Sequence, residues 1–400
     1  MEKKNYIFLI VSLYLNYFFQ GIASIVISQN LTIFQNQWGA SLSQVTLVIS
    51  AIGLGRILTL NLAGWFSDYF SRKLTVLVGV AADMLFFVGM VFTNNYFIAF
   101  IVALLAGVGN AFLDTSTYPI VVESFPSESD NGSLSVLNKA FISTGQFVLP
   151  IVVRWTLRNK IYFGWVFFIC DIGLLLNLIL LMQLSYPEKQ NSRPKSKKTL
   201  SEKTAVRPKK AKLHIEGLAL MIFSFVSVSL FNIFVFWIPT FAERVLSINK
   251  ADSLLFVSIY SICSFVSVFA TSVIVKKKVN ISNLILVCLG LTSLSILYMI
   301  WLPSLFSIIL ASSFVGLFAA GGIWQLGLAL LLEFFPMNKG IVTSFYSLST
   351  ALSVMSTPYI TGLMVEQSVY LAFIYNFILA VIGFLAMFIV KRRYQQLFKR

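Results

Sequence analysis

Two opposite charges stand at similar depth inside apolar segments of this sequence. Arg56 lies eight residues before Gly64, and Asp114 lies nine residues before Glu123. At a helical rise of 1.5 Å per residue, the two charges are about 12 and 13 Å from the same end of their segments. A charge inside a membrane segment costs at least ~2.5 kcal/mol, so it normally faces protein or water. We therefore expect Arg56 to hold a substrate carboxylate or hydroxyl, and Asp114 to carry a proton.

Other polar side chains recur on single helix faces and extend this candidate site. Asn110, Asp114 and Tyr118 are spaced every four residues, which places them on one face of a helix. The alternative is that such groups only bond neighbouring helices, as polar residues in membranes often do. The candidate substrate-binding residues are Arg56, Asp114, Asn110, Tyr118, Tyr14, Gln20, Lys139, Gln146, Asn232, Trp324 and Gln325.

Some charged and aromatic residues are open to more than one interpretation. Asp83 and Asp171 lie in predicted spans, and we interpret them as structural partners of basic or polar groups. Lys139 is a possible partner of either Asp114 or Asp83, and the sequence does not choose between them. Trp237 lies near the end of a predicted span, where tryptophan commonly anchors a helix at the membrane interface.

The composition excludes an ordinary soluble protein. Hydrophobic residues make up 58% of the chain and charged residues 11%, whereas soluble domains carry roughly 25% charged residues. Apolar runs of about twenty residues recur, the length that a helix needs to cross a ~30 Å hydrocarbon core. We therefore predict an all-α integral membrane protein with about twelve transmembrane helices. The predicted spans are 6–28, 44–63, 74–93, 96–122, 134–156, 162–184, 214–241, 252–275, 282–301, 305–335, 341–365 and 369–390.

The placement of the basic residues accounts for the net charge of +15. Lysine and arginine gather in alternate loops, in the segment between the sixth and seventh spans, and in the C-terminal tail. This asymmetry follows the positive-inside rule and predicts that both termini are cytoplasmic. We expect no nucleic-acid partner. The predicted organisation is a six-helix bundle at 1–186, a basic cytoplasmic linker at 187–213, a second six-helix bundle at 214–390 and a basic tail at 391–400.

The sequence offers little for catalysis or metal binding. Cys170, Cys263 and Cys288 lie in apolar runs without metal-ligand spacing. The single histidine, His214, has no nucleophile or set of metal ligands around it. We therefore expect no enzyme activity, no metal and no cofactor.

The segment that follows Arg56, GWFSDYFSRK at 64–73, resembles a loop of major facilitator superfamily transporters. That loop joins the second and third helices of the family and has the form G-x-x-x-D-x-x-G-R-K. Gly64, Asp68, Arg72 and Lys73 match it, and Ser71 stands where the family usually has glycine. The resemblance implies a fold of two six-helix bundles, with these four matching residues in gating.

Two further segments resemble a little-characterised bacterial branch of inner-membrane permeases. They are GNAFLDTSTYPIVVESFP at 109–126 and GGIWQLGLALLLEFFP at 321–336. The resemblance implies a multi-pass protein of the bacterial cytoplasmic membrane. It further implies a monomer whose partners are a small-molecule substrate, protons and the lipid bilayer.

The leading hypothesis is a secondary transporter that moves a small polar solute, an organic acid or a sugar-like molecule, by alternating access coupled to protons. Multidrug efflux is the alternative within transport, although STGQFVLP at 143–150 departs from the glycine-rich motif of drug–proton antiporters. A transport-inactive membrane sensor is the alternative from another class, because the basic linker and tail offer surfaces for a partner.

Overall fold

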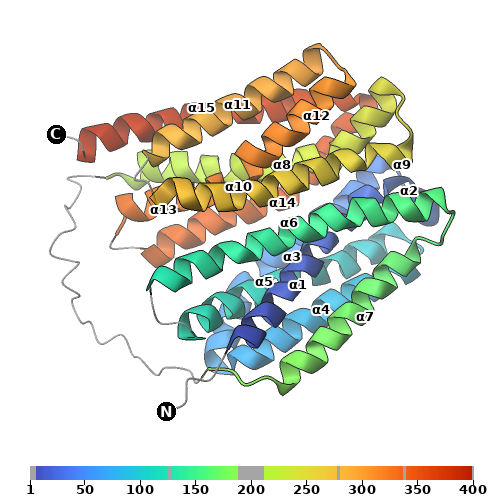
Figure 1. Cartoon of the computed structure of the whole chain (residues 1–400), viewed down its shortest axis with the longest axis horizontal. Coiled ribbons are helices and arrows are strands. Elements are labelled where there is room, and N and C mark those ends of the chain that lie inside the picture. The colour runs from blue at the N-terminus through green and yellow to red at the C-terminus, as the bar shows by residue number, and fades with distance from the viewer. Residues whose placement is uncertain (1–5, 125–127, 188–210, 277–279, 337–338, 399–400) are drawn as a thin grey trace.

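The computed structural model shows a bundle of long helices arranged in two groups (Figure 1). It describes residues 6–124, 128–187, 211–276, 280–336 and 339–398. Within these ranges, 12 helices are long and apolar enough to cross a membrane, which confirms the predicted all-α membrane class. The start of α1 and the end of α15 lie at the same end of the bundle, which we call the terminal side (Figure 1).

The first group of helices occupies the lower half of Figure 1, and its members pack mainly on one another. Within it, α5 packs on both α3 and α4, while α1 packs on α6. The group consists of α1 (Ile7–Gln29), α2 (Leu31–Trp38), α3 (Leu42–Tyr69), α4 (Arg72–Phe92), α5 (Tyr96–Ser124), α6 (Glu128–Arg158) and α7 (Gly164–Gln183).

The second group occupies the upper half of Figure 1 and is built around α8, which packs on α14 and α15. A π-helical turn, η3, interrupts the helix that the sequence predicts as one span at 305–335. The group consists of η2 (Leu213–Gly217), α8 (Leu218–Leu246), α9 (Lys250–Ser253), α10 (Leu255–Lys276), α11 (Ile281–Trp301), α12 (Leu305–Phe314), η3 (Val315–Ala320), α13 (Ile323–Phe334), α14 (Lys339–Gln367) and α15 (Val369–Phe398).

Several helices differ from the sequence prediction. The GWFSDYFSRK segment is mostly helical, because α3 continues to Tyr69 and α4 begins at Arg72. The short helix α2 follows α1 although no element is predicted there, and α15 extends through most of the predicted basic tail, to Phe398. Most of the predicted linker at 187–213 lies outside the described residues.

Ser71 caps the N-terminus of α4. Ser71 has an extended backbone, with φ −164° and ψ 150°, and its side chain accepts a hydrogen bond from the backbone N–H of Leu74. This is the N-cap arrangement that serine favours. No left-handed backbone is needed at this position, so the absence of the usual glycine does not disturb the turn.

The two groups meet mainly along two helix pairs, α3 with α14 and α6 with α10. The backbones of α3 and α14 approach so closely that a Cβ on Gly53 would clash with the backbone at Met355. Near the middle of the other pair, the hydroxyls of Ser143 and Ser264 are 3.2 Å apart. These close approaches fix the walls of the space that remains between the groups.

At the side opposite the termini, an ion-pair cluster joins α6 of the first group to α9 of the second. Arg154 and Arg158 both contact Oδ1 of Asp252, at 2.8 and 2.6 Å. Nearby along the other helix pair, the backbone N–H of Ser43 donates to the carboxylate of Glu366 at 2.8 Å. Polar contacts therefore connect the two groups on this side.

Candidate functional site

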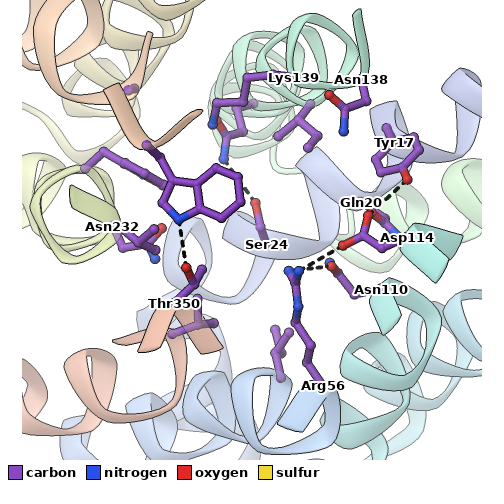
Figure 2. A pocket seen from close by; sticks show the side chains of 18 of the residues that line it. Tyr17, Gln20, Ser24, Arg56, Asn110, Asp114, Asn138, Lys139, Asn232 and Thr350 are labelled. Atoms are coloured by element: carbon purple, nitrogen blue, oxygen red, sulfur yellow. Dashed lines mark hydrogen bonds and ion pairs between the residues drawn. The ribbon is translucent and has the colours of Figure 1, made fainter. Parts of the chain in front are cut away.

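A cavity of about 240 Å³ lies between the two groups of helices. Its polar walls come from α1, α3, α5 and α6 of the first group and from α8, α13 and α14 of the second (Figure 2). It is lined by Tyr17, Gln20, Ser24, Ile49, Ile52, Arg56, Asn110, Asp114, Tyr118, Asn138, Lys139, Ile142, Gln146, Val228, Phe231, Asn232, Phe236, Ala319, Ala320, Trp324, Gln325, Thr350 and Val354.

An ion pair between Arg56 and Asp114 forms the centre of the first group's wall (Figure 2). Nη2 of Arg56 lies 2.9 Å from Oδ2 of Asp114, and Nη1 donates to Oδ1 of Asn110 at 3.0 Å. The hydroxyl of Tyr17 donates to the other carboxylate oxygen of Asp114, also at 3.0 Å. The Arg56 and Asp114 side chains remain 25% and 17% exposed, so both can reach a molecule in the cavity.

Close helix packing brings Arg56 next to Asp114. A Cβ on Gly107 of α5 would clash with the carbonyl oxygen of Ile52 in α3, and a Cβ on Gly55 would clash with that of Leu104. Glycine at both crossing points lets the two helix backbones approach, as small residues do in membrane helix pairs. Arg56 and Asp114, which the sequence places at similar depth, are therefore in direct contact.

Lys139 projects into the cavity without a carboxylate partner. Among the described residues, none of the ion pairs includes it, and its Nζ lies 4.7 Å from the centre of the Phe231 ring. The structure thus pairs Lys139 with neither Asp114 nor Asp83, the two partners that the sequence left open. The charged residues around the cavity are two cations and one carboxylate, so the cavity has a positive bias.

The second group contributes an aromatic and amide wall. Nε1 of Trp324 donates to Oγ1 of Thr350 at 2.8 Å, and the hydroxyl of Tyr346 donates to the Trp324 carbonyl at 2.8 Å. These bonds fix the indole as a rigid wall. Asn232 and Gln325 also line the cavity and make no side-chain hydrogen bond within the described chain. Their amides are available to a solute.

The structure brings all but one of the sequence-predicted binding residues to this cavity. The exception is Tyr14, which is 3% exposed and lies behind the wall. Its ring packs on the rings of Tyr17 and Phe141, with centroids 6.3 and 5.8 Å away. Trp237 also differs from expectation: the prediction of an interfacial anchor is wrong, because the side chain is fully buried and donates to Thr361.

Sequence reasoning left four polar lining residues out of the candidate set: Tyr17, Ser24, Asn138 and Thr350. Tyr17 and Ser24 share a face of α1 with Gln20, so the helical period alone could have included them. Asn138 donates to the hydroxyl of Tyr118 at 2.5 Å, a contact that depends on how α5 and α6 pack.

The residues that match the gating motif lie at the terminal side of the first group. Arg72 forms an ion pair with Glu123 of α5 at 2.7 Å, and Lys73 donates to the carbonyl of Met182 in α7 at 2.6 Å. Both contacts stay within the first group and tie α4 to its neighbours. Gly64 has open space where a side chain would be, and Asp68 lies in the last turn of α3.

Comparison with known proteins shows which family this chain belongs to. Residues 13–305 match the model of the Major Facilitator Superfamily. The chain belongs to the major facilitator superfamily. Membership in this family of transporters identifies the chain as a transporter and not an enzyme, as the sequence predicts.

Relatives of this superfamily member cover almost its whole length. It is 33% identical to the "Uncharacterized MFS-type transporter YfkL" of Bacillus subtilis (strain 168), over 96% of each chain. It is 30% identical to the "Inner membrane transport protein YdiM" of Escherichia coli (strain K12), over 97% of this chain and 95% of that protein. These relatives match the permease branch that the sequence suggests.

Solved structures share the superfamily fold. A D-xylose-proton symporter superposes with a TM-score of 0.75 at 18% identity, covering 96% of this chain and 97% of that one. A mutant of the nucleoside transporter NupG superposes with a TM-score of 0.74 at 13% identity, covering 95% of this chain and 99% of that one. At such identities the likeness describes the fold alone.

Proposed function

We propose that this transporter moves a small hydroxylated carboxylate by alternating access, coupled to protons. The observation that carries the proposal is the cavity between the two helix groups. It combines Lys139, a cation that forms no ion pair with any described residue, with an Arg56–Asp114 pair and several amides. A positive, hydrogen-bonding cavity suits a solute that bears one negative charge and several hydroxyls.

The size and lining of the cavity favour a small polar solute. Its volume of about 240 Å³ is below the range of roughly 300–1,000 Å³ typical of pockets for drug-sized ligands. Lys139 would hold the carboxylate, while Asn232 and Gln325 would bond hydroxyls across the cavity. The Trp324 ring would cover an apolar face of the solute. A hydrophobic cation, the usual cargo of multidrug efflux, would meet two positive charges here.

The Arg56–Asp114 pair offers a route for coupling to protons. A solute carboxylate or hydroxyl that attracts Arg56 would weaken its 2.9 Å contact with Asp114. A carboxylate that loses its cationic partner in a poorly hydrated site favours its protonated form. Solute binding and proton binding would then support each other, which is the requirement for symport.

We further propose that the terminal side faces the cytoplasm of a bacterium and that the chain acts as a monomer in the cytoplasmic membrane. The basic loops and tail support this orientation. The inner-membrane relative at 30% identity supports the location. The two six-helix bundles, 1–186 and 214–390, would then be the moving halves.

A ligand screen tests the proposed substrate class. Binding to the folded state stabilises a protein, by about 2.7 kcal/mol at a hundredfold excess over Kd. We expect D-gluconate to raise the unfolding temperature of the purified protein, and neutral D-xylose to do so less. Stabilisation by ethidium alone would contradict the proposal and favour multidrug efflux. D-gluconate binding without uptake into proteoliposomes would favour the transport-inactive sensor.

The ion-pair cluster at the side opposite the termini should influence which side of the cavity opens. In Asp252→Asn, the contacts with Arg154 and Arg158 weaken, because asparagine carries no negative charge. We expect the form that is open on this side to become a few-fold more populated, a modest change because exposed ion pairs contribute little to stability. Single-molecule energy transfer between dyes on the two groups would measure the change.

Lys160→Gln is the matched control for this experiment. Lys160 is an exposed cation near the same end of α6, and it belongs to none of the ion pairs between described residues. Its replacement removes a charge of the same size and opposite sign without touching the cluster, and it should leave the distance distribution unchanged. A shift as large as that of Asp252→Asn, in either direction, would show that opening responds to any charge change on this side and not to the cluster.

A further inference from the structure

A second carboxyl group lies deep in the first group, away from the Arg56–Asp114 pair. Asp83 stands eleven residues after the start of α4, so about 16 Å along the helix and near the middle of the membrane. Its side chain is 1% exposed, and neither carboxyl oxygen has a hydrogen-bond partner among the described residues. The sequence-based interpretation gave Asp83 a basic or polar partner. No ion pair between described residues includes Asp83, and its polar neighbour is Gln20.

Among the described residues, no cationic side chain forms an ion pair with Asp83. The Asp83 side chain is buried, and the Gln20 side chain of α1 lies beside it as a polar neighbour. The helices packed on α4 carry other charges, including Arg56 and Asp68 of α3, Asp114 of α5 and Asp171 of α7, and none of these forms an ion pair with Asp83. An isolated carboxylate without a cation is costly to bury, by several kcal/mol after relaxation, so the enclosed group holds a proton.

The neighbouring helix α5 leaves space for the Asp83 carboxyl group. A Cβ on Gly109 of α5 would clash with Oδ1 of Asp83. Glycine at this point lets α5 close over the acid. The helix arrangement thus accommodates an acid in its neutral form and shields it from lipid and from the other charges.

Gln20 connects this enclosed acid to the cavity. It lines the cavity wall that also carries Asp114, as Figure 2 shows, and it is the polar neighbour of Asp83. Its Nε2 forms no hydrogen bond within the described chain, so the amide is not committed to another partner. An amide that can donate on one side and accept on the other can bridge cavity water and a carboxyl group.

We propose that Asp83 is a second proton-binding site, which exchanges its proton with cavity water past Gln20. The proton comes from water in the cavity and forms an O–H bond on the Asp83 carboxylate. It leaves by the same path when the helices around it move. This inference rests on the proposed proton coupling, and it adds a proton carrier behind the solute site.

Infrared spectroscopy of the full chain in lipid nanodiscs tests whether Asp83 holds an exchangeable proton, and it needs no transported substrate. A protonated carboxylic acid has a carbonyl-stretch band of its own, and that band shifts when the acid exchanges its proton for deuterium. We expect such a band at neutral pH, lost in Asp83→Asn and retained in Asp114→Asn. We expect it to shift promptly in D₂O, and more slowly in Gln20→Leu.

Gln29→Leu is the matched control, because Gln29 is also a buried glutamine of α1 whose side chain has no hydrogen-bond partner among the described residues, and it does not line the cavity. In this variant the acid band should shift in D₂O as fast as in the parent. A band that survives Asp83→Asn, or is absent from the parent, would overturn the proposal. So would a band that never shifts in D₂O, because a sealed structural acid behaves that way.

A binding measurement separates this inference from the proposed function. If solute binding changes whether Asp83 holds its proton, the change in the Kd for D-gluconate per pH unit differs by up to tenfold between the parent and Asp83→Asn. If the Kd for D-gluconate depends on pH equally in the parent and in Asp83→Asn, the proton on Asp83 is not coupled to solute binding. Failure of D-gluconate to bind at all contradicts the proposed function, while the infrared band still decides whether Asp83 holds an exchangeable proton.

Discussion

Asp114→Asn is expected to abolish the accumulation of D-gluconate that a pH gradient drives, while exchange of D-gluconate across the membrane survives. Asparagine keeps the shape of aspartate, and its carbonyl oxygen can still accept from Arg56 or Tyr17, the partners seen at 2.9 and 3.0 Å. It cannot bind or release a proton, so binding and conformational change persist without coupling. Uptake and counterflow in proteoliposomes measure the two properties separately.

Asp171→Asn serves as the control for this prediction. Asp171 is another carboxylate inside a spanning helix, but it lies on α7 and does not line the cavity. Its replacement should leave gradient-driven uptake intact. Normal accumulation by Asp114→Asn would contradict the assigned role, and a loss of both uptake and counterflow would show that Asp114 is needed for binding itself.

Lys139→Met is expected to weaken D-gluconate binding by at least roughly 30-fold, because truncating one member of a buried charge pair costs about 2–5 kcal/mol. Methionine keeps the length of the side chain and its contact with the Phe231 ring, while the positive charge disappears. The substitution should barely change the affinity for D-gluconamide, a neutral analogue of the same shape. Calorimetric titration of both ligands measures the difference.

Lys139→Arg tests whether charge alone is required. It should retain most of the preference for D-gluconate over D-gluconamide, since a cation remains in the cavity, although its planar shape changes the geometry. If Lys139→Met binds D-gluconate as tightly as the parent does, the carboxylate binds elsewhere. Arg56, the other cation in the cavity wall, would then be the candidate.

Much of the candidate site could be inferred from sequence because depth along a helix follows from counting residues. Arg56 and Asp114 were matched in depth by the helical rise, and the structure joins them at 2.9 Å. The recurrence of Asn110, Asp114 and Tyr118 likewise placed one face of α5 against the cavity. Both inferences use periodicity within one helix and need no knowledge of its neighbours.

The sequence could not determine which neighbour each polar group meets. Lys139 had two candidate acids and contacts neither of them, because the packing of α6 turns it toward Phe231. Tyr14 lies close in sequence to residues that line the cavity, yet it packs behind Tyr17. Trp237 stands near a helix end but donates to Thr361 of another helix.

By itself, the sequence determined the class of protein, the number and approximate position of its membrane helices, and the depth of its charges. Tertiary structure decided the partners: the contact of Lys139 with the Phe231 ring, the close packing of α3 on α5, and the enclosure of Asp83. The physical reason is that a membrane helix is apolar toward lipid and toward much of its protein neighbours alike. Hydrophobicity therefore marks where a helix spans the membrane, but packing between helices sets its rotation and hence the site.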